Sequence, residues 1–272
     1  MQIFINNIAC NSLDLPTRMA YGDGIFETIR IDNHTALLLN AHVARFRDSA
    51  IFFDLVSDAF NWTEFRRTLV ETAEKIPDGI IKVIMVRKQQ GRGYRYCPDA
   101  GSDIIFECYE GSIPTGWQVS PADVGVSSIP CSLNAALAGH KHLNRLDSVL
   151  AAKEIQQAGW DEGLLCVAGQ VFEASGANLF LLNNGEIVTP ELSQAGVNGV
   201  VRREILNEFP VRVMPEISIS DCINADAMFL TNAVKMIWPV NSLTVMDRII
   251  RYDLEDPVLN RVVSCFRNRL SC

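Results

Sequence analysis

The sequence predicts an α/β protein that is built from two modules. Segments that alternate apolar and polar residues, as half-buried strands do, recur between segments with the apolar spacing of helices. The chain of 272 residues is 48% hydrophobic and 21% charged, so it can bury a large core. Several predicted strands lie next to hairpin turns, and the sequence has no G-x-G-x-x-G or P-loop motif. These features argue against a doubly wound Rossmann sheet.

The first module is expected to alternate strands and helices up to about residue 110. Four segments alternate in polarity or are rich in β-branched residues and are expected as strands: 2–6, Gly24–Asp32, 80–86 and 103–109. Helical spacing follows Asn40, a possible N-cap, over 41–55, and follows Asn61 or Thr63 up to Lys75. The polar segment 89–95, which contains two glycines, is expected to be a loop.

The second module follows a segment whose Pro114 and Gly116 are typical of a linker. Strands are expected over 124–129, 164–167, 176–182, 186–189, 225–231 and Arg248–Arg251, and helices over 147–158, 198–209 and 256–270. The triplet Asn183-Asn184-Gly185 indicates a tight hairpin between two of these strands. We therefore expect a first domain over 1–112, a linker over 113–122 and a second domain over 123–272.

Charge and cysteine content exclude several classes of protein. The net charge is −8, and an acidic chain repels phosphate backbones, so we expect no nucleic-acid partner. No apolar run is long enough to span a membrane, and the first residues do not resemble a signal peptide. The eight cysteines are scattered and the four histidines lack zinc-ligand spacing to them. The sequence predicts a cytoplasmic protein with reduced thiols and no metal site.

Among the six lysines, Lys141 is the candidate nucleophile. It lies in Ala-Gly-His-Lys-His-Leu-Asn-Arg, residues 138–145, between a predicted loop and the helix over 147–158. A Schiff-base enzyme needs one lysine in a restrained, partly desolvated site, because only a neutral amine is nucleophilic. Local sequence leaves a basic exposed turn as the alternative.

Four other positions add binding chemistry. Glu173 precedes a run of small residues and could direct a carboxylate into a cavity. Residues 194–199 precede a helix, whose first N–H groups suit a phosphate, and Thr231 and Asn232 end a strand with further donors. Arg45 on the first helix could bind phosphate as well. Each of these positions has a structural alternative as a turn, a cap or a surface residue. Together, however, they fit pyridoxal phosphate.

Four strings occur in an order that resembles a known family: Tyr-Gly-Asp-Gly-Ile-Phe-Glu-Thr (21–28), Lys-His-Leu-Asn-Arg (141–145), Glu-Ala-Ser-Gly-Ala-Asn-Leu-Phe (173–180) and Gln-Ala-Gly-Val-Asn-Gly (194–199). They are similar to the class IV aminotransferases, the fold-type IV pyridoxal-phosphate enzymes. The resemblance implies a small N-terminal α/β domain and a larger C-terminal domain with a mixed or antiparallel, barrel-like sheet. It also implies a cofactor in the cleft between the domains and a homodimer whose partner completes the site.

The resemblance assigns site residues by motif position. Lys141 would bond the cofactor covalently and Glu173 would contact its pyridine nitrogen. The remaining cofactor contacts are Arg45, the amides of Val197 and Asn198, Thr231 or Asn232, and Asn178 near the ring.

Within the family, three strings resemble 4-amino-4-deoxychorismate lyases. These are Lys-His-Leu-Asn-Arg-Leu (141–146), residues 194–199 and Gly-Arg-Gly-Tyr (91–94). The implied reaction, a step of folate biosynthesis, converts 4-amino-4-deoxychorismate to 4-aminobenzoate and pyruvate. Residues 173–178 look more like the aminotransferase version, so a D-amino-acid or branched-chain aminotransferase is the alternative. A catalytically silent protein on this fold is the third hypothesis.

A dicarboxylate substrate requires cationic side chains in an otherwise acidic chain. Arg30 on a predicted strand and Arg92 on the polar loop are the candidates, with a surface or structural role as the alternative for both. Phe26 and Tyr94, from the same two motifs, are expected to contact substrate as well.

Overall fold

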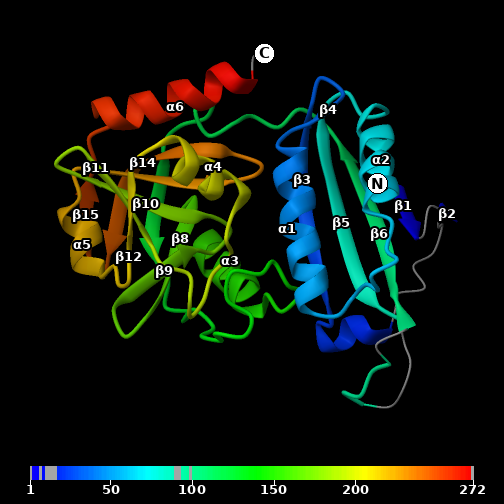
Figure 1. Ribbon diagram of the computed structural model, residues 1–272. Helices are drawn as coiled ribbons and strands as arrows, with labels where there is room; N and C mark the ends of the chain where they lie inside the picture. Colours follow the sequence, from blue (N-terminus) through cyan, green and yellow to red (C-terminus); the bar gives the residue numbers. More distant parts are fainter. Residues whose placement is uncertain (1, 6–7, 10–16, 89–92, 98–99, 271–272) are drawn as a thin grey trace. The chain divides into compact units, whose positions relative to one another are not determined.

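The computed structural model describes residues 2–5, 8–9, 17–88, 93–97 and 100–270 (Figure 1). The chain divides into two compact units. The first unit comprises Met1–Ile113 with His140–Asn144, and the second comprises Pro114–Gly139 with Arg145–Cys272. The sequence analysis drew a single boundary at 113–122, whereas the structure also assigns the segment around Lys141 to the first unit.

The first unit is built on an antiparallel sheet with the strand order β2-β1-β6-β5-β3-β4. Its strands are β1 (Gln2–Ile5), β2 (Ile8–Ala9), β3 (Gly24–Asp32), β4 (Thr35–Ala36), β5 (Gly79–Arg87) and β6 (Ser102–Glu110), with the short 3-10 helix η1 (Thr17–Tyr21) before β3. The three long strands β3, β5 and β6 are those that alternation and β-branched residues predict.

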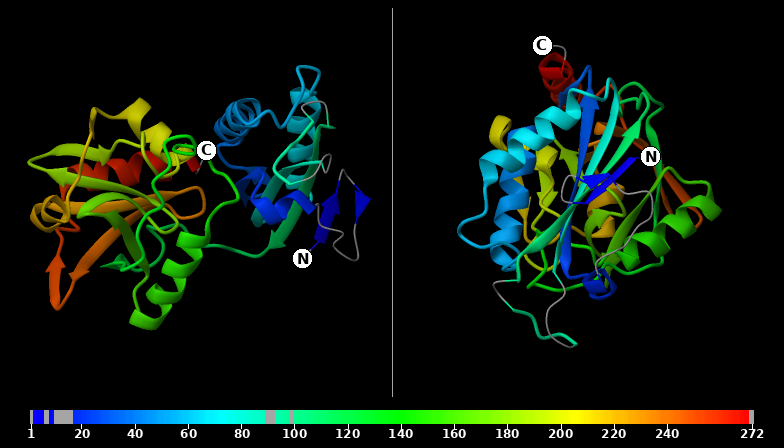
Figure 2. Two further views of the ribbon diagram at one scale, coloured as in Figure 1. Left: turned by 90° about the horizontal axis from the view of Figure 1, so that it is seen from below. Right: turned by 90° about the vertical axis from the view of Figure 1, so that its right-hand side faces the viewer.

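Helices α1 (Leu39–Phe52) and α2 (Trp62–Ala73) cover one face of this sheet (Figure 2). Phe46 of α1 stacks on Phe65 of α2 with ring centroids 5.2 Å apart, above the buried isoleucines of β3. The predicted cap of α2 is confirmed, because the Asn61 side chain accepts a hydrogen bond from the Glu64 amide at 3.0 Å. The predicted cap of α1 is wrong: the helix starts at Leu39 after a left-handed Leu38, which puts Asn40 inside the first turn.

The second unit contains a curled, mixed sheet, which confirms the predicted fold class. Its strands are β7 (Ala122–Val126), β8 (Glu162–Val167), β9 (Gln170–Ala174), β10 (Asn178–Asn183), β11 (Glu186–Pro190), β12 (Val211–Met214), β13 (Ala227–Asn232), β14 (Met236–Val245) and β15 (Arg248–Arg251). The order is β12-β11-β10-β13-β14-β7-β8-β9, with β15 paired to β14. Strand pairs β11–β12, β14–β7 and β7–β8 are parallel and the other pairs are antiparallel.

Buried residues from nearly all these strands form one core inside the curl, including Leu164, Leu179, Leu230 and Leu243. The helices are α3 (Leu146–Ala158), α4 (Val200–Glu208), α5 (Ile219–Asn224) and α6 (Pro257–Leu270), and α6 packs against β14. The predicted hairpin joins β10 to β11, with Asn184 and Gly185 at φ 49° and 79°, the left-handed backbone that such a turn requires.

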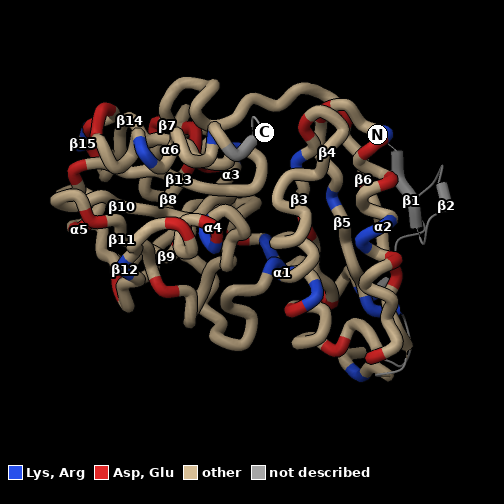
Figure 3. Tube along the Cα trace, turned by 45° about the horizontal axis from the view of Figure 1, so that its top comes forward, with Lys and Arg blue, Asp and Glu red and all other residues tan. Residues whose placement is uncertain are grey.

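Acidic and basic residues are interspersed in both units (Figure 3). Within the described part of the chain, none of the helices combines the length and hydrophobicity needed to cross a membrane.

Candidate functional site

Lys141 lies on a short extended segment that pairs with β3 inside the first unit. The Phe26 amide donates to the Lys141 carbonyl at 2.9 Å, and the Leu143 amide donates to the Gly24 carbonyl at 3.0 Å. Ile25 and His142 face each other across this antiparallel bridge. These two backbone hydrogen bonds flank His142 and fix the chain directly after the Lys141 side chain, which a basic exposed turn, the alternative left by local sequence, would not do.

Two lysine amines lie near the ring of Phe26. Nζ of Lys141 is 4.3 Å from the ring centroid, and Nζ of Lys82 on β5 is 5.9 Å from it. The Lys82 amine also lies 3.3 Å from a carboxylate oxygen of Glu107. Sequence analysis interpreted Lys82 only as a strand residue, because the pairing of β5 with β3 that brings it to Phe26 is not visible in local sequence.

Arg30 is the next candidate on β3. Strand residues of equal parity share a face, so Arg30 belongs to the face that carries Phe26. Burial lowers the pKa of the Arg30 guanidinium, and the carboxylates of Asp32 and Asp78 oppose that effect. The side chain is buried, so a solvated surface arginine is excluded and a structural arginine stays the alternative.

The opposite face of β3 carries a buried ionic group. The Glu27 carboxylate accepts hydrogen bonds from Arg45 Nε at 2.7 Å and Nη2 at 2.6 Å, and it lies 2.6 Å from His42 Nδ1. Burial raises the pKa of Glu27, but Arg45 and His42 outweigh it and lower that pKa to about 2. Burial lowers the pKa of His42, and the charges of Arg45 and Lys141 act in the same direction. Arg45, expected at a phosphate, is thus engaged with Glu27.

The polar loop of the first unit is described only in part, and Arg92 lies outside the described residues. Tyr94 is 84% exposed and meets the ring of Tyr21 edge-on at 5.4 Å. Arg18 supports the loop by donating to the carbonyls of Gly93 and Arg95 at 3.1 and 3.2 Å.

In the second unit, Glu173 on β9 is buried against the turn that precedes α4. Its Oε2 accepts a hydrogen bond from the Val197 amide at 2.9 Å, and its Oε1 lies 3.9 Å from Arg145 Nη1. Gly196 at φ 83° permits this approach, because a Cβ there would lie 3.2 Å from Oε2. The carboxylate predicted to be functional is therefore buried and held in place.

Asn178 and Thr231 are paired residues on neighbouring strands beside the same turn. The Asn178 side chain donates to the Val197 carbonyl at 2.7 Å. The Thr231 hydroxyl is buried and has no hydrogen-bond partner among the described residues. Asn232 has a structural role, since its side chain accepts from the amides of Val234 and Lys235 at 3.0 and 2.7 Å.

A family model described as amino-transferase class IV matches residues 24–243. The chain belongs to this family. An aminodeoxychorismate lyase of Vibrio harveyi is 28% identical over 243 residues, which cover 86% of this chain and 88% of that relative. A putative branched-chain-amino-acid aminotransferase of Methanocaldococcus jannaschii is 30% identical over 258 residues, which cover 88% of this chain and 87% of that relative.

Solved structures agree with this family membership. The 4-amino-4-deoxychorismate lyase of Pseudomonas aeruginosa superposes with a TM-score of 0.86 at 29% identity, over 99% of this chain and 100% of that chain. A branched-chain aminotransferase of T.th., solved with pyridoxamine 5′-phosphate, shares the fold with a TM-score of 0.82 at 23% identity, over 98% of this chain and 93% of that chain. Class IV enzymes use pyridoxal 5′-phosphate and act on small molecules, and so does this chain.

The second unit of this class IV enzyme fits the phosphate of the cofactor. Thr231 supplies a buried hydroxyl that lacks a partner within the described chain, and α4, which contacts β13, begins at Val200 after Gly199, an N-cap residue without a side-chain hydrogen bond. The first amides of a helix lack intrahelical partners and bind anions. The two amides expected to bind phosphate are engaged elsewhere: that of Val197 donates to Glu173, and that of Asn198 donates to the Gly139 carbonyl at 3.0 Å.

Arg202, which sequence analysis missed, adds a buried positive charge to the first turn of α4. Its Nη1 donates to Asn198 Oδ1 at 3.2 Å and its Nη2 to the Pro190 carbonyl at 3.0 Å, while Nε has no partner among the residues described. Burial and the charge of Arg203 lower the pKa of Arg202 to about 10. The sequence signal that could have found Arg202 is its position on a predicted helix, four residues after Asn198.

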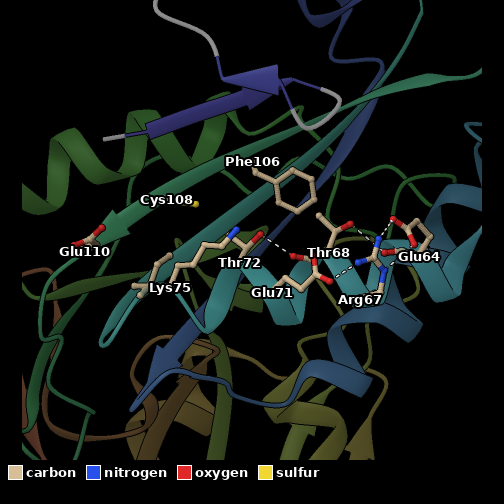
Figure 4. Close-up of a pocket in the computed structure, with 10 residues that line it drawn as sticks. Glu64, Arg67, Thr68, Glu71, Thr72, Lys75, Phe106, Cys108 and Glu110 are labelled. Carbon is tan, nitrogen blue, oxygen red and sulfur yellow. Dashed lines mark hydrogen bonds and ion pairs between the residues drawn. The ribbon is translucent and has the colours of Figure 1, made fainter.

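A groove of about 480 Å³ between α2 and β6 of the first unit is a weaker candidate (Figure 4). Its lining has three carboxylates and two cations, and Arg67 on α2 bonds both Glu64 and Glu71, so it has no strong net charge. Burial raises the pKa of the Cys108 thiol at its floor, so that thiol is a poor nucleophile. No group of metal-binding side chains occurs in the described ranges.

Proposed function

We propose that this class IV enzyme is a 4-amino-4-deoxychorismate lyase, which forms 4-aminobenzoate and pyruvate. The observation that carries the proposal is the pair of lysine amines beside one aromatic ring: Lys141 Nζ at 4.3 Å and Lys82 Nζ at 5.9 Å from the centroid of Phe26. A lyase of this kind needs one amine for chemistry and a second cation for a dianionic substrate. Similarity to the Vibrio and Pseudomonas lyases supports the same conclusion.

Lys141 is the proposed catalytic residue. It would bond the cofactor covalently at rest, and its amine would be free once substrate is bound. The freed Nζ then removes the proton from the substrate carbon that bears nitrogen and delivers a proton to the departing enolpyruvyl oxygen. One carbon–oxygen bond breaks and the ring becomes aromatic, so the products balance as 4-aminobenzoate and pyruvate. The bound cofactor supplies an electron-withdrawing ring that makes the substrate proton removable.

The second-unit residues hold the cofactor in this proposal. Glu173 would contact the pyridine nitrogen, and its carboxylate is held in place by the Val197 amide and lies 3.9 Å from Arg145. The phosphate is bound by the Thr231 hydroxyl and the first amides of α4, and Arg202 strengthens the positive potential there.

Substrate carboxylates are assigned to Lys82, with Arg30 on the same strand face as Phe26 as the second cation. Both side chains come from long central strands, which hold them more rigidly than a loop would. Tyr94 and Arg92 of the polar loop stay proposed contacts that only substrate-bound measurements can test.

The alternative is aminotransferase activity, which the similarity to the Methanocaldococcus relative favours. Lys141 would then return the proton to the cofactor instead of to a leaving group. Product analysis separates the two activities. Purified protein is incubated with enzymatically generated 4-amino-4-deoxychorismate, and 4-aminobenzoate and pyruvate are quantified by chromatography. Lys141→Ala is expected to abolish turnover, and Lys153→Ala, at an exposed lysine, is the matched control.

Absence of both products from a visibly cofactor-loaded protein would overturn the lyase proposal. Leucine and D-alanine with 2-oxoglutarate are then the substrates to test. A colourless protein that binds no cofactor would instead favour the third hypothesis, a catalytically silent protein on this fold.

We also propose that the enzyme is a homodimer. Helix α3 presents Leu146, Val149 and Leu150, which are 71%, 62% and 46% exposed and share one face by their spacing. An apolar helix face of this kind is typical of a subunit interface. Light scattering after size exclusion should give the dimer mass for the natural protein and the monomer mass for Val149→Glu.

A further inference from the structure

His140, the residue directly before Lys141, is held by the end of α1. Its ring stacks on Phe52 with centroids 4.4 Å apart and planes 22° apart, and it meets Phe53 edge-on at 4.9 Å and 65°. Its Nδ1 lies 2.9 Å from the hydroxyl oxygen of Ser49. We refer to Ser49, Phe52, Phe53 and His140 as the His140 clamp. All four residues belong to the first unit.

Of the two phenylalanines of the clamp, Phe53 packs against the hydrophobic core of that unit and Phe52 does not. Ser49 and Phe52 are three residues apart on α1 and therefore lie on the same side of the helix. Phe52 remains 57% exposed and is not among the residues of the core cluster that contains Phe46 and Phe65. Phe52 therefore contributes little to the core. Its stacking on His140 indicates that its role is to hold that ring.

The clamp and β3 restrain the same short segment from two sides. On one side, β3 is bonded to the Lys141 carbonyl through the Phe26 amide at 2.9 Å. On the other, α1 holds the ring of the preceding residue through Ser49 and Phe52. With both restraints the Lys141 backbone cannot shift along β3, so its amine stays over the ring of Phe26.

We propose that His140 is a positioning residue that, through Ser49 and Phe52, fixes the amine of Lys141 for reaction. This inference rests on the proposed role of Lys141. A shift of about 1 Å in a reacting group can cost up to about 100-fold in rate. Loss of the clamp is therefore expected to lower kcat by about 10-fold to 100-fold and to leave KM for substrate nearly unchanged, since His140 is not assigned to substrate binding.

Four variants divide the clamp into its contacts. His140→Ala removes all of them, His140→Phe keeps the ring stacking, His140→Asn keeps a polar atom for Ser49, and Phe52→Ala removes the stacking alone. His34→Ala is the matched control, because His34 is an exposed histidine of the same unit whose Nδ1 lies 3.0 Å from the Glu74 carbonyl, away from the clamp.

The decisive readout is hydrogen exchange of individual backbone amides in the cofactor-loaded protein. In His140→Ala the amides of Phe26 and Leu143 should exchange about 10-fold faster or more, because both bonds to the Lys141 segment loosen. Amides of β10 and β13 in the second unit should keep their rates. The pH at which the visible absorption band of the bound cofactor changes should also shift, which a purely structural contact would not cause.

Unchanged exchange at Phe26 and Leu143 in His140→Ala, with unchanged kcat, would overturn the proposal. If His140→Ala loosens the whole protein, Phe52→Ala and His140→Phe decide the matter, because each leaves part of the clamp in place. Reduction with borohydride followed by peptide mass analysis keeps this test separate from the proposed function. Cofactor attached elsewhere than Lys141 refutes the proposed function, whereas attachment at Lys141 without lyase products refutes only the lyase reaction.

Discussion

The carboxylate of Glu27 on β3 receives two hydrogen bonds from the guanidinium of Arg45 on α1, at 2.7 and 2.6 Å. Both side chains are almost completely buried, and His42 completes the group at 2.6 Å. Glu27 belongs to the same sequence motif as Phe26, so two neighbouring residues of one strand have different roles. Phe26 contacts the amine of Lys141, and Glu27 anchors the helix that carries Ser49 and Phe52.

Glu27→Gln should destabilise the protein strongly. Removing one member of a buried ion pair leaves the other charge uncompensated and costs about 3–5 kcal/mol. Urea unfolding followed by circular dichroism measures this free energy. Glu64→Gln is the matched control, because Glu64 pairs with Arg67 on the exposed side of α2 and exposed pairs contribute about 1 kcal/mol or less. Equal losses in the two variants would contradict the structural assignment.

The same carboxylate should make stability depend on pH. The pKa of Glu27 is about 2 in the folded protein against an ordinary value of 4.5. As the pH falls, Glu27 is therefore protonated in the unfolded chain before it is protonated in the folded protein. The stabilisation is present above pH 4.5 and is lost as the pH falls towards 2. A shift of this size corresponds to about 3 kcal/mol. Unfolding free energies at pH 5 and pH 2.5 should therefore differ more in the natural protein than in Glu27→Gln. A difference of the same size in both proteins would show that other carboxylates cause the acid sensitivity.

Thr231→Val should weaken cofactor binding without weakening the protein that lacks cofactor. The hydroxyl has no partner within the described chain, so its loss leaves no new unsatisfied group. A hydrogen bond to a charged phosphate contributes about 1.5–3 kcal/mol, which corresponds to about 10-fold to 100-fold in Kd. Equilibrium dialysis against pyridoxal phosphate gives the Kd, and thermal unfolding of the cofactor-free protein gives its stability.

Thr189→Val is the matched control for Thr231→Val. The Thr189 hydroxyl is equally buried but donates to the Leu179 carbonyl at 2.8 Å. Its loss should lower the melting temperature and leave the Kd for cofactor unchanged. The opposite pattern in the two variants would remove Thr231 from the phosphate site.

The sequence predicted those helices and strands whose signals lie within a few neighbouring residues. Strand β3 has the bounds Gly24–Asp32 that alternation gave, and the N-cap of α2 follows from the Asn61 side chain. Strand β14 was missed because Pro239 and the polar Asn241 interrupt its apolar pattern. It forms nevertheless, because its neighbours β13 and β7 supply hydrogen bonds from distant parts of the chain.

The site shows the same division between local and distant information. Motif order selected Lys141 and Glu173 as candidates, but it could not show which partners fold against them. Arg45 was assigned to phosphate, and its ion pair with Glu27 depends on the packing of α1 on β3. Lys82 was passed over because only the register of β5 against β3 brings its amine near Phe26.

Lys82→Met should raise KM for 4-amino-4-deoxychorismate and leave the cofactor in place. The Lys82 amine is partly exposed and lies 3.3 Å from Glu107, so it can exchange that contact for a substrate carboxylate. Loss of one charge-assisted hydrogen bond costs about 1.5–3 kcal/mol, or about 10-fold to 100-fold in KM. Initial rates over a range of substrate concentrations measure the change, and in the natural enzyme KM should rise with salt because the contact is ionic.

Lys88→Met, at an exposed lysine 3.8 Å from Asp103, is the control that should leave KM unchanged. A KM that stays the same in Lys82→Met, or that rises equally in Lys88→Met, would take Lys82 out of the substrate site and leave Arg30 as the described cation on that face of β3.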